Sequence, residues 1–181
     1  MGWSDFHRRR AVMDRVLAEA RREGRIPFDL PSDLVAEVRD VFGTEERLLQ
    51  ALHHRWSQVL AGHLRAEGVE PEQAETADEH ADGVDAVSRA WRAAVRRHPT
   101  LHAVVTASVA RHPSLRRAHE EQLRLLALLS GLAEPHEPHD ELVAVGATVV
   151  ALFGRREAER SERRPAASPL GQLLRRLAPT A

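Results

Sequence analysis

The sequence predicts an all-α fold, and three observations support this prediction. Alanine, leucine, arginine and glutamate dominate almost every segment, and all four have high helix propensities. Apolar residues recur three and four positions apart, whereas the alternating β-branched pattern of strands is missing. With 181 residues, 43% of them hydrophobic, the chain is long enough for a bundle of about eight or nine helices around a buried core.

The N-terminal segment predicts two helices. The first runs from about Ser4 to Glu23, and Gly24 is a natural C-terminal stop. Its apolar face is formed by Val12, Val16, Leu17 and Ala20. Two prolines in "RIPFDLPSD" exclude a continuous helix, so we expect Ser32 or Asp33 to cap a short helix that ends at Phe42. Its apolar residues are Leu34, Val35, Val38 and Val41.

The next helix has the clearest start signal of all the predicted helices. Thr44 is a good capping residue, and two glutamates follow it in the first turn, where the helix dipole favours anions. We expect this helix to reach about Ala66, with an apolar stripe of Leu48, Leu52, Trp56, Val59 and His63. The acidic stretch 68–83 is poor in apolar residues, which predicts a loop.

Four further segments complete the predicted fold. A helix over 84–97 directs Val84, Val87, Trp91, Ala94 and Val95 inward. "RHPTL" and "RHPSL" recur fourteen residues apart and start two helices at their prolines, over 100–110 and 114–132. "AEPHEPHD" is a turn before a last core helix over 141–153. We expect a head at 1–44, a body at 45–154, and at 155–181 a charged linker, "GRREAERSERRPAASP", with an amphipathic tail helix over 170–177.

The order of these elements resembles the tetracycline-repressor (TetR) family of one-component regulators. The most specific match is "FGTEERLL", which is similar to the Phe-Gly-Ser-Lys-Glu-Glu-Leu-Leu signature after that family's helix-turn-helix, except that Glu45 replaces the lysine. "RRRAVMDRVLAEARREG" resembles the first helix of the family. "HPSLRRAHEEQLRLLALLSGLA" and "DELVAVGATVVALF" resemble its C-terminal dimerisation pair. The resemblance covers residues 8–153 and implies a homodimeric, DNA-binding sensor.

The head departs from the family pattern in length and in charge. Only seventeen residues separate Gly24 from Phe42, where the family has two helices and an Ala-Gly-Val-Ser-like turn. Residues 26–50 hold two arginines and six acids, a net charge of −4, whereas a recognition helix must approach a polyanion. Residues 1–25 carry a net +3, from seven arginines and four acids. The candidate DNA-binding residues are therefore Arg8, Arg9, Arg10 and Arg39.

Two apolar groups are candidates for the other functional surfaces. The two C-terminal helices are apolar on several sides, which predicts either a two-fold interface or a monomer core. The interface residues would be Leu125, Leu129, Leu142, Val145, Val149 and Phe153, with Ala144, Gly146 and Ala147 allowing close helix approach. A pocket for a small apolar ligand, or else ordinary core, is predicted at Trp56, His63, Trp91 and Val95.

Several classes of function have no support in the sequence. The chain has no cysteine, phosphate-binding glycine loop, HExxH motif or nucleophile elbow, so we expect neither an enzyme nor a cofactor. The eleven histidines are scattered, and even "HEPHD" at 136–140 lacks the ligands of a metal site. No apolar run is long enough to cross a bilayer, and the first ten residues lack a signal-peptide core, which predicts a cytoplasmic protein.

Two functions follow from these observations. The resemblance favours a TetR-like homodimeric transcriptional regulator that senses a small apolar ligand. The length and charge of the head favour a regulator-derived ligand-binding or protein-interaction module that has lost DNA binding.

Overall fold

The chain is α-helical throughout the part that the structure describes. The computed structural model describes residues 3–24, 30–70 and 83–163, with side chains up to Arg155. These ranges contain seven α-helices, a 3-10 turn and no strand, which confirms the all-α class. The tail helix expected over 170–177 lies outside them. The elements are α1 (Trp3–Glu23), α2 (Ser32–Phe42), α3 (Glu45–Ala66), α4 (Gly83–Arg97), α5 (Pro99–Val109), the 3-10 turn η2 (Pro113–Leu115), α6 (Arg116–Leu129) and α7 (His139–Arg163).

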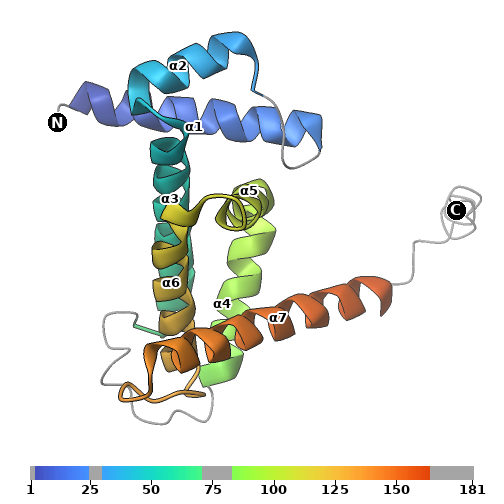
Figure 1. Cartoon of the computed structure of the whole chain (residues 1–181). Coiled ribbons are helices and arrows are strands. Elements are labelled where there is room, and N and C mark those ends of the chain that lie inside the picture. The colour runs from blue at the N-terminus through green and yellow to red at the C-terminus, as the bar shows by residue number, and fades with distance from the viewer. Residues whose placement is uncertain (1–2, 25–29, 71–82, 164–181) are drawn as a thin grey trace, which may run out of the picture.

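The helices are arranged around the long axis of α3 (Figure 1). α1 and α2 pack on each other and lie across the N-terminal end of α3, while α4 runs alongside α3. α5 lies beneath α1, and α7 crosses the opposite end of the molecule and packs on α6. Buried apolar side chains from all seven helices form one continuous core. The head is therefore packed into the body and does not have a core of its own.

α1 buries the face that its apolar spacing predicts, whereas α2 buries only part of its predicted face, since Val35 is exposed and Val41 is half-buried. The four α1 residues Val12, Val16, Leu17 and Ala20 are buried, and Gly24 adopts a positive φ of 65° after the last turn. α2 buries Leu34, Val38 and Phe42, whereas Val35 is exposed. The N-cap of α2 is Pro31, without a side-chain cap, so the prediction that Ser32 or Asp33 caps this helix is wrong.

The start of α3 is as predicted. The Thr44 hydroxyl accepts a hydrogen bond from the Arg47 N–H at 3.2 Å, and Gly43 precedes it with a φ of 79°. Leu48, Leu52 and Trp56 are buried, whereas Val59 and His63 are half-buried. α3 also buries Leu49, His53, Leu60 and Leu64, a wider face than the predicted stripe.

The two "RHP" segments start different elements. α5 begins at Pro99, as expected, but the second segment first forms the 3-10 turn Pro113–Leu115, and α6 starts at Arg116. α6 ends at Leu129 rather than at Leu132, because Gly131 takes a positive φ of 67° and terminates the helix.

The last helix is longer than predicted. α7 begins at His139 and continues to Arg163, so the first ten residues of the expected linker are helical. "GRREAERSER" consists mostly of good helix formers, and charge alone does not end a helix. The expected domain boundary at 154 therefore falls inside α7.

Candidate functional site

Two of the four arginines that were predicted to contact DNA, Arg8 and Arg9, lie against side chains of α2. Arg8 forms an ion pair with Asp40, and Arg9 lies over the Phe42 ring with its guanidinium carbon 5.7 Å from the ring centre. Together with Asp5 and Val41, these charged side chains line a hollow of about 130 Å³. Its mixed charge does not suit a phosphate backbone.

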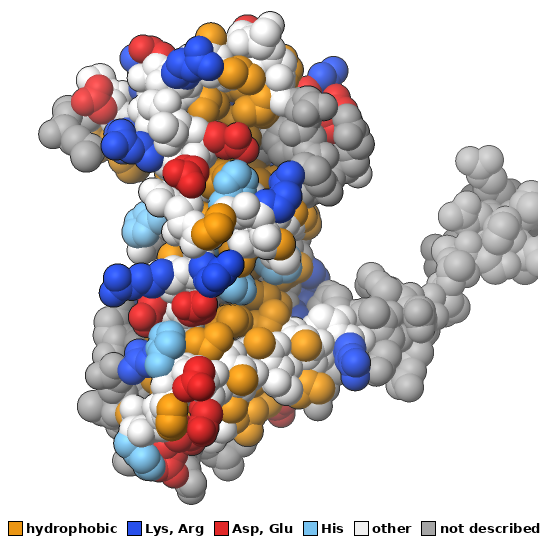
Figure 2. Space-filling view, in the orientation of Figure 1, with side chains coloured by type: hydrophobic (Ala, Val, Ile, Leu, Met, Phe, Trp, Pro, Cys, Tyr) orange, Lys and Arg blue, Asp and Glu red, His pale blue; other side chains and the backbone are white. Residues whose placement is uncertain are grey.

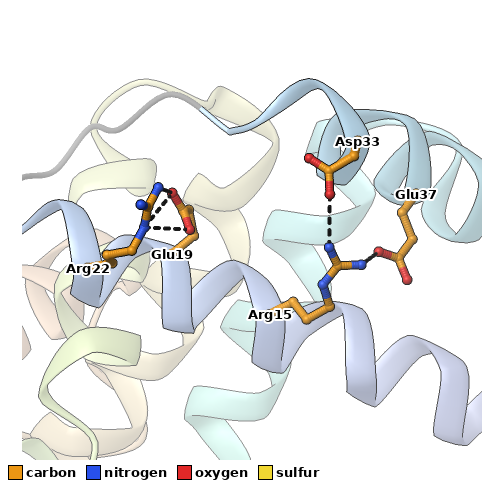
Figure 3. A network of polar contacts seen from close by, with 5 residues as sticks. All are labelled: Arg15, Glu19, Arg22, Asp33 and Glu37. Carbon is orange, nitrogen blue, oxygen red and sulfur yellow. Dashed lines mark hydrogen bonds and ion pairs between the residues drawn. The ribbon is translucent and has the colours of Figure 1, made fainter.

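A second ion-pair group joins the same two helices (Figure 3). The Arg15 guanidinium contacts Asp33 at 3.1 Å and also Glu37, one helical turn further along α2. Arg22 pairs with Glu19 within α1 and not with α2, and that carboxylate raises the pKa of Arg22. All three acids of α2 are thus bound by arginines of α1.

The structure describes a single helix between the first helix of the head and α3. Within the described ranges, α2 is the one helix between α1 and α3, and residues 25–29 are not described. Arg10 and Arg39 are exposed, and their side chains form no ion pair with another residue of those ranges. Of the four predicted DNA-binding arginines, only these two lack both an acidic and an aromatic partner among the described residues.

Two of the four predicted ligand-pocket residues contact each other in the body. Trp56 and Trp91 lie edge to face with ring centres 5.5 Å apart, and both are buried. His102 of α5 completes the cluster, 4.9 Å from Trp56 and 5.3 Å from Trp91. Burial among these rings lowers the pKa of His102, so its imidazole is neutral at pH 7.

The structure leaves the pocket itself a prediction. His63 and Val95 are half-buried, and the aromatic rings fill the space between α3, α4 and α5 with direct contacts. The sequence analysis did not place His102 in this cluster, because helix periodicity does not show which helices pack against α5. The cluster has the geometry of a packed aromatic core.

The six predicted interface residues differ in how far they are buried within one chain. Leu129, Leu142, Val149 and Phe153 are buried within one chain, whereas Leu125 and Val145 are half-buried. Gly146 explains the close approach of the two helices, since a Cβ there would collide with the Leu123 carbonyl group. Ala144 and Ala147, which were expected to allow the same approach, are exposed instead.

The outward face of α7 has an unusual composition for a helix in water. No residue from Leu142 to Gly154 is charged, a length of roughly 20 Å at 1.5 Å per residue. Leu152 is 47% exposed, and Leu132, just beyond α6, is 51% exposed. Figure 2 shows hydrophobic side chains gathered over this part of the body. Surface helices normally carry charged residues on the face away from the core.

A second exposed apolar group lies at the start of α1. In this part of the chain the sequence analysis had singled out only arginines. Trp3 is 79% exposed and Phe6 is 57% exposed, and both rings contact His7. Aromatic side chains exposed in this way are typical of protein contact surfaces.

The described histidines do not form a metal centre. No three His, Asp or Glu side chains converge within those parts of the chain, and His136 of the "HEPHD" segment is an exposed residue beside Glu134 at 3.2 Å. None of the helices described is long and apolar enough to span a bilayer.

In comparisons with known proteins, no family model, curated protein or solved structure matches the chain. The resemblance to TetR regulators therefore stays a prediction.

Proposed function

We propose that the chain is a cytoplasmic, homodimeric ligand-binding or protein-interaction module with the element order of a TetR-like regulator, and that its head does not read DNA. The observation that carries this proposal is the pairing of α1 arginines with α2 acids. Arg8 and Arg15 are bound by Asp40, Asp33 and Glu37, so they offer little net charge to a phosphate backbone.

The shape of the head supports the same proposal. In a helix-turn-helix, one helix crosses the DNA backbone and the next, the recognition helix, lies in the major groove. Here α2 is followed directly by the capped start of α3, and its charged residues are three acids and one arginine, a net charge of −2. An acidic helix near DNA would be repelled by the phosphates.

The charge-free face of α7 supports self-association. In a two-fold dimer the same patch is used by both chains, so an apolar face can cover its own copy. Half-buried Leu125 and Val145 lie beside this face, and exposed Leu152 would become buried in the dimer. Trp3 and Phe6 offer a separate apolar surface for a protein partner.

The regulator remains the second candidate, and Arg10 and Arg39 favour it. Both side chains are exposed, and no carboxylate in the described ranges forms an ion pair with them. Placed on both heads of a dimer, they would supply four cationic contacts to a duplex.

DNA binding separates the two candidates. The purified protein, first shown to be a dimer by analytical ultracentrifugation, would be titrated with a fluorescent library of fragments of its own genome at about 50 mM and about 200 mM salt. The proposal expects no selective binding at either concentration. Selective binding that weakens steeply with salt would instead establish the regulator.

The dimer interface has its own test. Leu152→Arg places a charge on the α7 face and should raise the dimer dissociation constant at least about 30-fold, or roughly 2 kcal/mol. Val35→Arg is the matched control, since Val35 is also an exposed aliphatic residue but lies on α2. Equal dissociation constants for both variants would place the interface elsewhere.

A further inference from the structure

An open pocket lies where the head meets the body. It is bounded by α1, by the middle of α3 and by the corner between α4 and α5, and its volume is about 280 Å³. This is close to the lower end of the roughly 300–1,000 Å³ of small-molecule sites. The residues that line it are Asp14, Leu17, Ala18, Arg21, Arg55, Arg97, His98, Pro99, Thr100 and Leu101.

Arginines from three different helices converge on this pocket. Arg21 comes from α1, Arg55 from α3 and Arg97 from the end of α4. Arg55 donates a hydrogen bond to Asp14 at 2.6 Å, and its side chain is 27% exposed. Neither Arg21 nor Arg97 forms an ion pair with any carboxylate of residues 3–24, 30–70 or 83–155. Three arginines and one acid give the lining a net charge of +2.

Two further features bear on the pocket. Burial, and then the positive charges of Arg55 and Arg97, lower the pKa of His98, so this lining residue adds no net charge to the arginines near pH 7. α5 begins at the pocket, and its N-cap residue His98 provides no side-chain cap. The first-turn N–H groups of Thr100 and Leu101 have no acceptor within the helix, which adds donors and a positive helix end to the arginines.

We propose that this pocket binds the dianionic phosphate of a small molecule, either a phosphate monoester or free phosphate. The +2 lining matches the charge of about −1.5 to −2 that a phosphate monoester carries at pH 7. Planar guanidinium groups bind phosphate oxygens through paired hydrogen bonds. The apolar wall at Leu17, Ala18 and Pro99 leaves room for a short organic group.

Binding at this place would connect the head to the body. A phosphate held by Arg21, Arg55 and Arg97 contacts α1, α3 and the α4–α5 corner at once. The bound anion would therefore favour one position of α1 over others, which couples ligand occupancy to the placement of the head. This site is separate from the α7 face and from Arg10 and Arg39, so it does not depend on self-association or on DNA binding.

Calorimetric titration of the full chain at about pH 8 tests the site, because a phosphate monoester is then a dianion. The probes are inorganic phosphate and glycerol 3-phosphate, with glycerol as the uncharged control. The proposal expects saturable binding of at least one phosphate, with one site per chain, and no binding of glycerol. Binding of inorganic phosphate alone would identify free phosphate as the ligand, and tighter binding of the ester would identify a phosphorylated metabolite.

Substitutions at Arg21 and Arg97 assign the binding to this pocket. Arg21→Gln combined with Arg97→Gln should weaken phosphate binding by about tenfold or more. Arg10→Gln is the matched control, because Arg10 is an exposed arginine of the same helix α1 outside the pocket. Asp14→Asn removes the acid of the lining and should tighten binding, a gain that misfolding could not produce. Absence of saturable binding, or equal binding by the double variant and the control, would overturn the proposal.

Discussion

The head and the α6–α7 pair use their side chains in opposite ways. In the head, helices α1 and α2 are held together by Arg8 and Arg15 against three acids, on a largely exposed surface. In the α6–α7 pair, the contact is made by leucine, valine and phenylalanine around Gly146. The outer side of α7 then remains uncharged over Leu142 to Gly154.

The difference separates charges that are satisfied within the chain from apolar side chains that remain exposed. Charges that are paired within one chain offer little to a polyanion, so a basic N-terminal sequence does not by itself make a DNA-binding surface. An apolar helix face, in contrast, keeps a favourable free energy of burial until something covers it.

The largest change in the free energy of unfolding is expected at the α6–α7 contact. Gly146→Ala should lower the free energy of unfolding by about 3 kcal/mol, because its Cβ would collide with the Leu123 backbone. Gly154→Ala on the same helix is the control, since no atom lies within 4 Å of a Cβ there. This control should stabilise the protein by roughly 0.5–1 kcal/mol. Urea denaturation measures both, and a similar loss in the two variants would contradict the close contact.

A second effect is a dependence of stability on pH, which we expect to arise from buried histidines of the body. Burial lowers the pKa of His53, His102 and His119, and His53 is further affected by His119 and His54. Below the ordinary histidine pKa of about 6.5, the unfolded chain binds protons that the folded chain does not. The free energy of unfolding should therefore fall as the pH drops through this value, until the lower folded-state pKa values are reached.

Urea denaturation at about pH 7.5 and about pH 5.5 measures this loss. His102→Phe keeps a ring between the two tryptophans and removes one titrating group, so the loss should be smaller in this variant. Equal stability of the unaltered protein at both pH values would exclude buried neutral imidazoles.

A smaller effect is expected at the junction between the two regions. Thr44→Ala removes the side-chain acceptor at the start of α3 and should lower the free energy of unfolding by about 1 kcal/mol. Thr44→Ser keeps the hydroxyl and should retain most of the stability. If both variants lose the same amount, the capping hydrogen bond is not the cause.

The smallest effect on stability is expected from the ion pairs of the head. Asp33→Asn, Glu37→Gln and Asp40→Asn together release Arg8 and Arg15, and exposed ion pairs contribute only about 0–1 kcal/mol each. The triple variant should nevertheless gain non-specific DNA affinity, with a salt slope steeper by about 0.9 for each new phosphate contact.

The same change of net charge on the body provides the control for this experiment. Glu121→Gln, Asp140→Asn and Glu141→Gln alter exposed acids of α6 and α7. Fluorescence anisotropy with a random duplex at low salt should detect binding by the head variant alone. Equal gains in DNA affinity in both variants would show that pairing with the α2 acids does not keep the α1 arginines from binding DNA.

Features that depend on neighbouring residues are determined by the sequence itself. The apolar face of α1, the stop at Gly24, the Thr44 cap and the start of α5 at Pro99 all follow from helix periodicity and from backbone chemistry within a few residues. The shortness of the head follows from the sequence too, since seventeen residues leave room for one helix and not for two.

Features that depend on distant residues were decided by tertiary packing alone. Sequence pattern showed that Leu129, Leu142, Val149 and Phe153 would be buried, but not that the other helix of the same chain covers them. His102 lies beside Trp56 and Trp91 because α5 packs on both α3 and α4. Arg21, Arg55 and Arg97 line one pocket because α1 also packs on α5. Helix periodicity fixes which side chains share a face, whereas the partner of that face is set by packing between segments far apart in the chain.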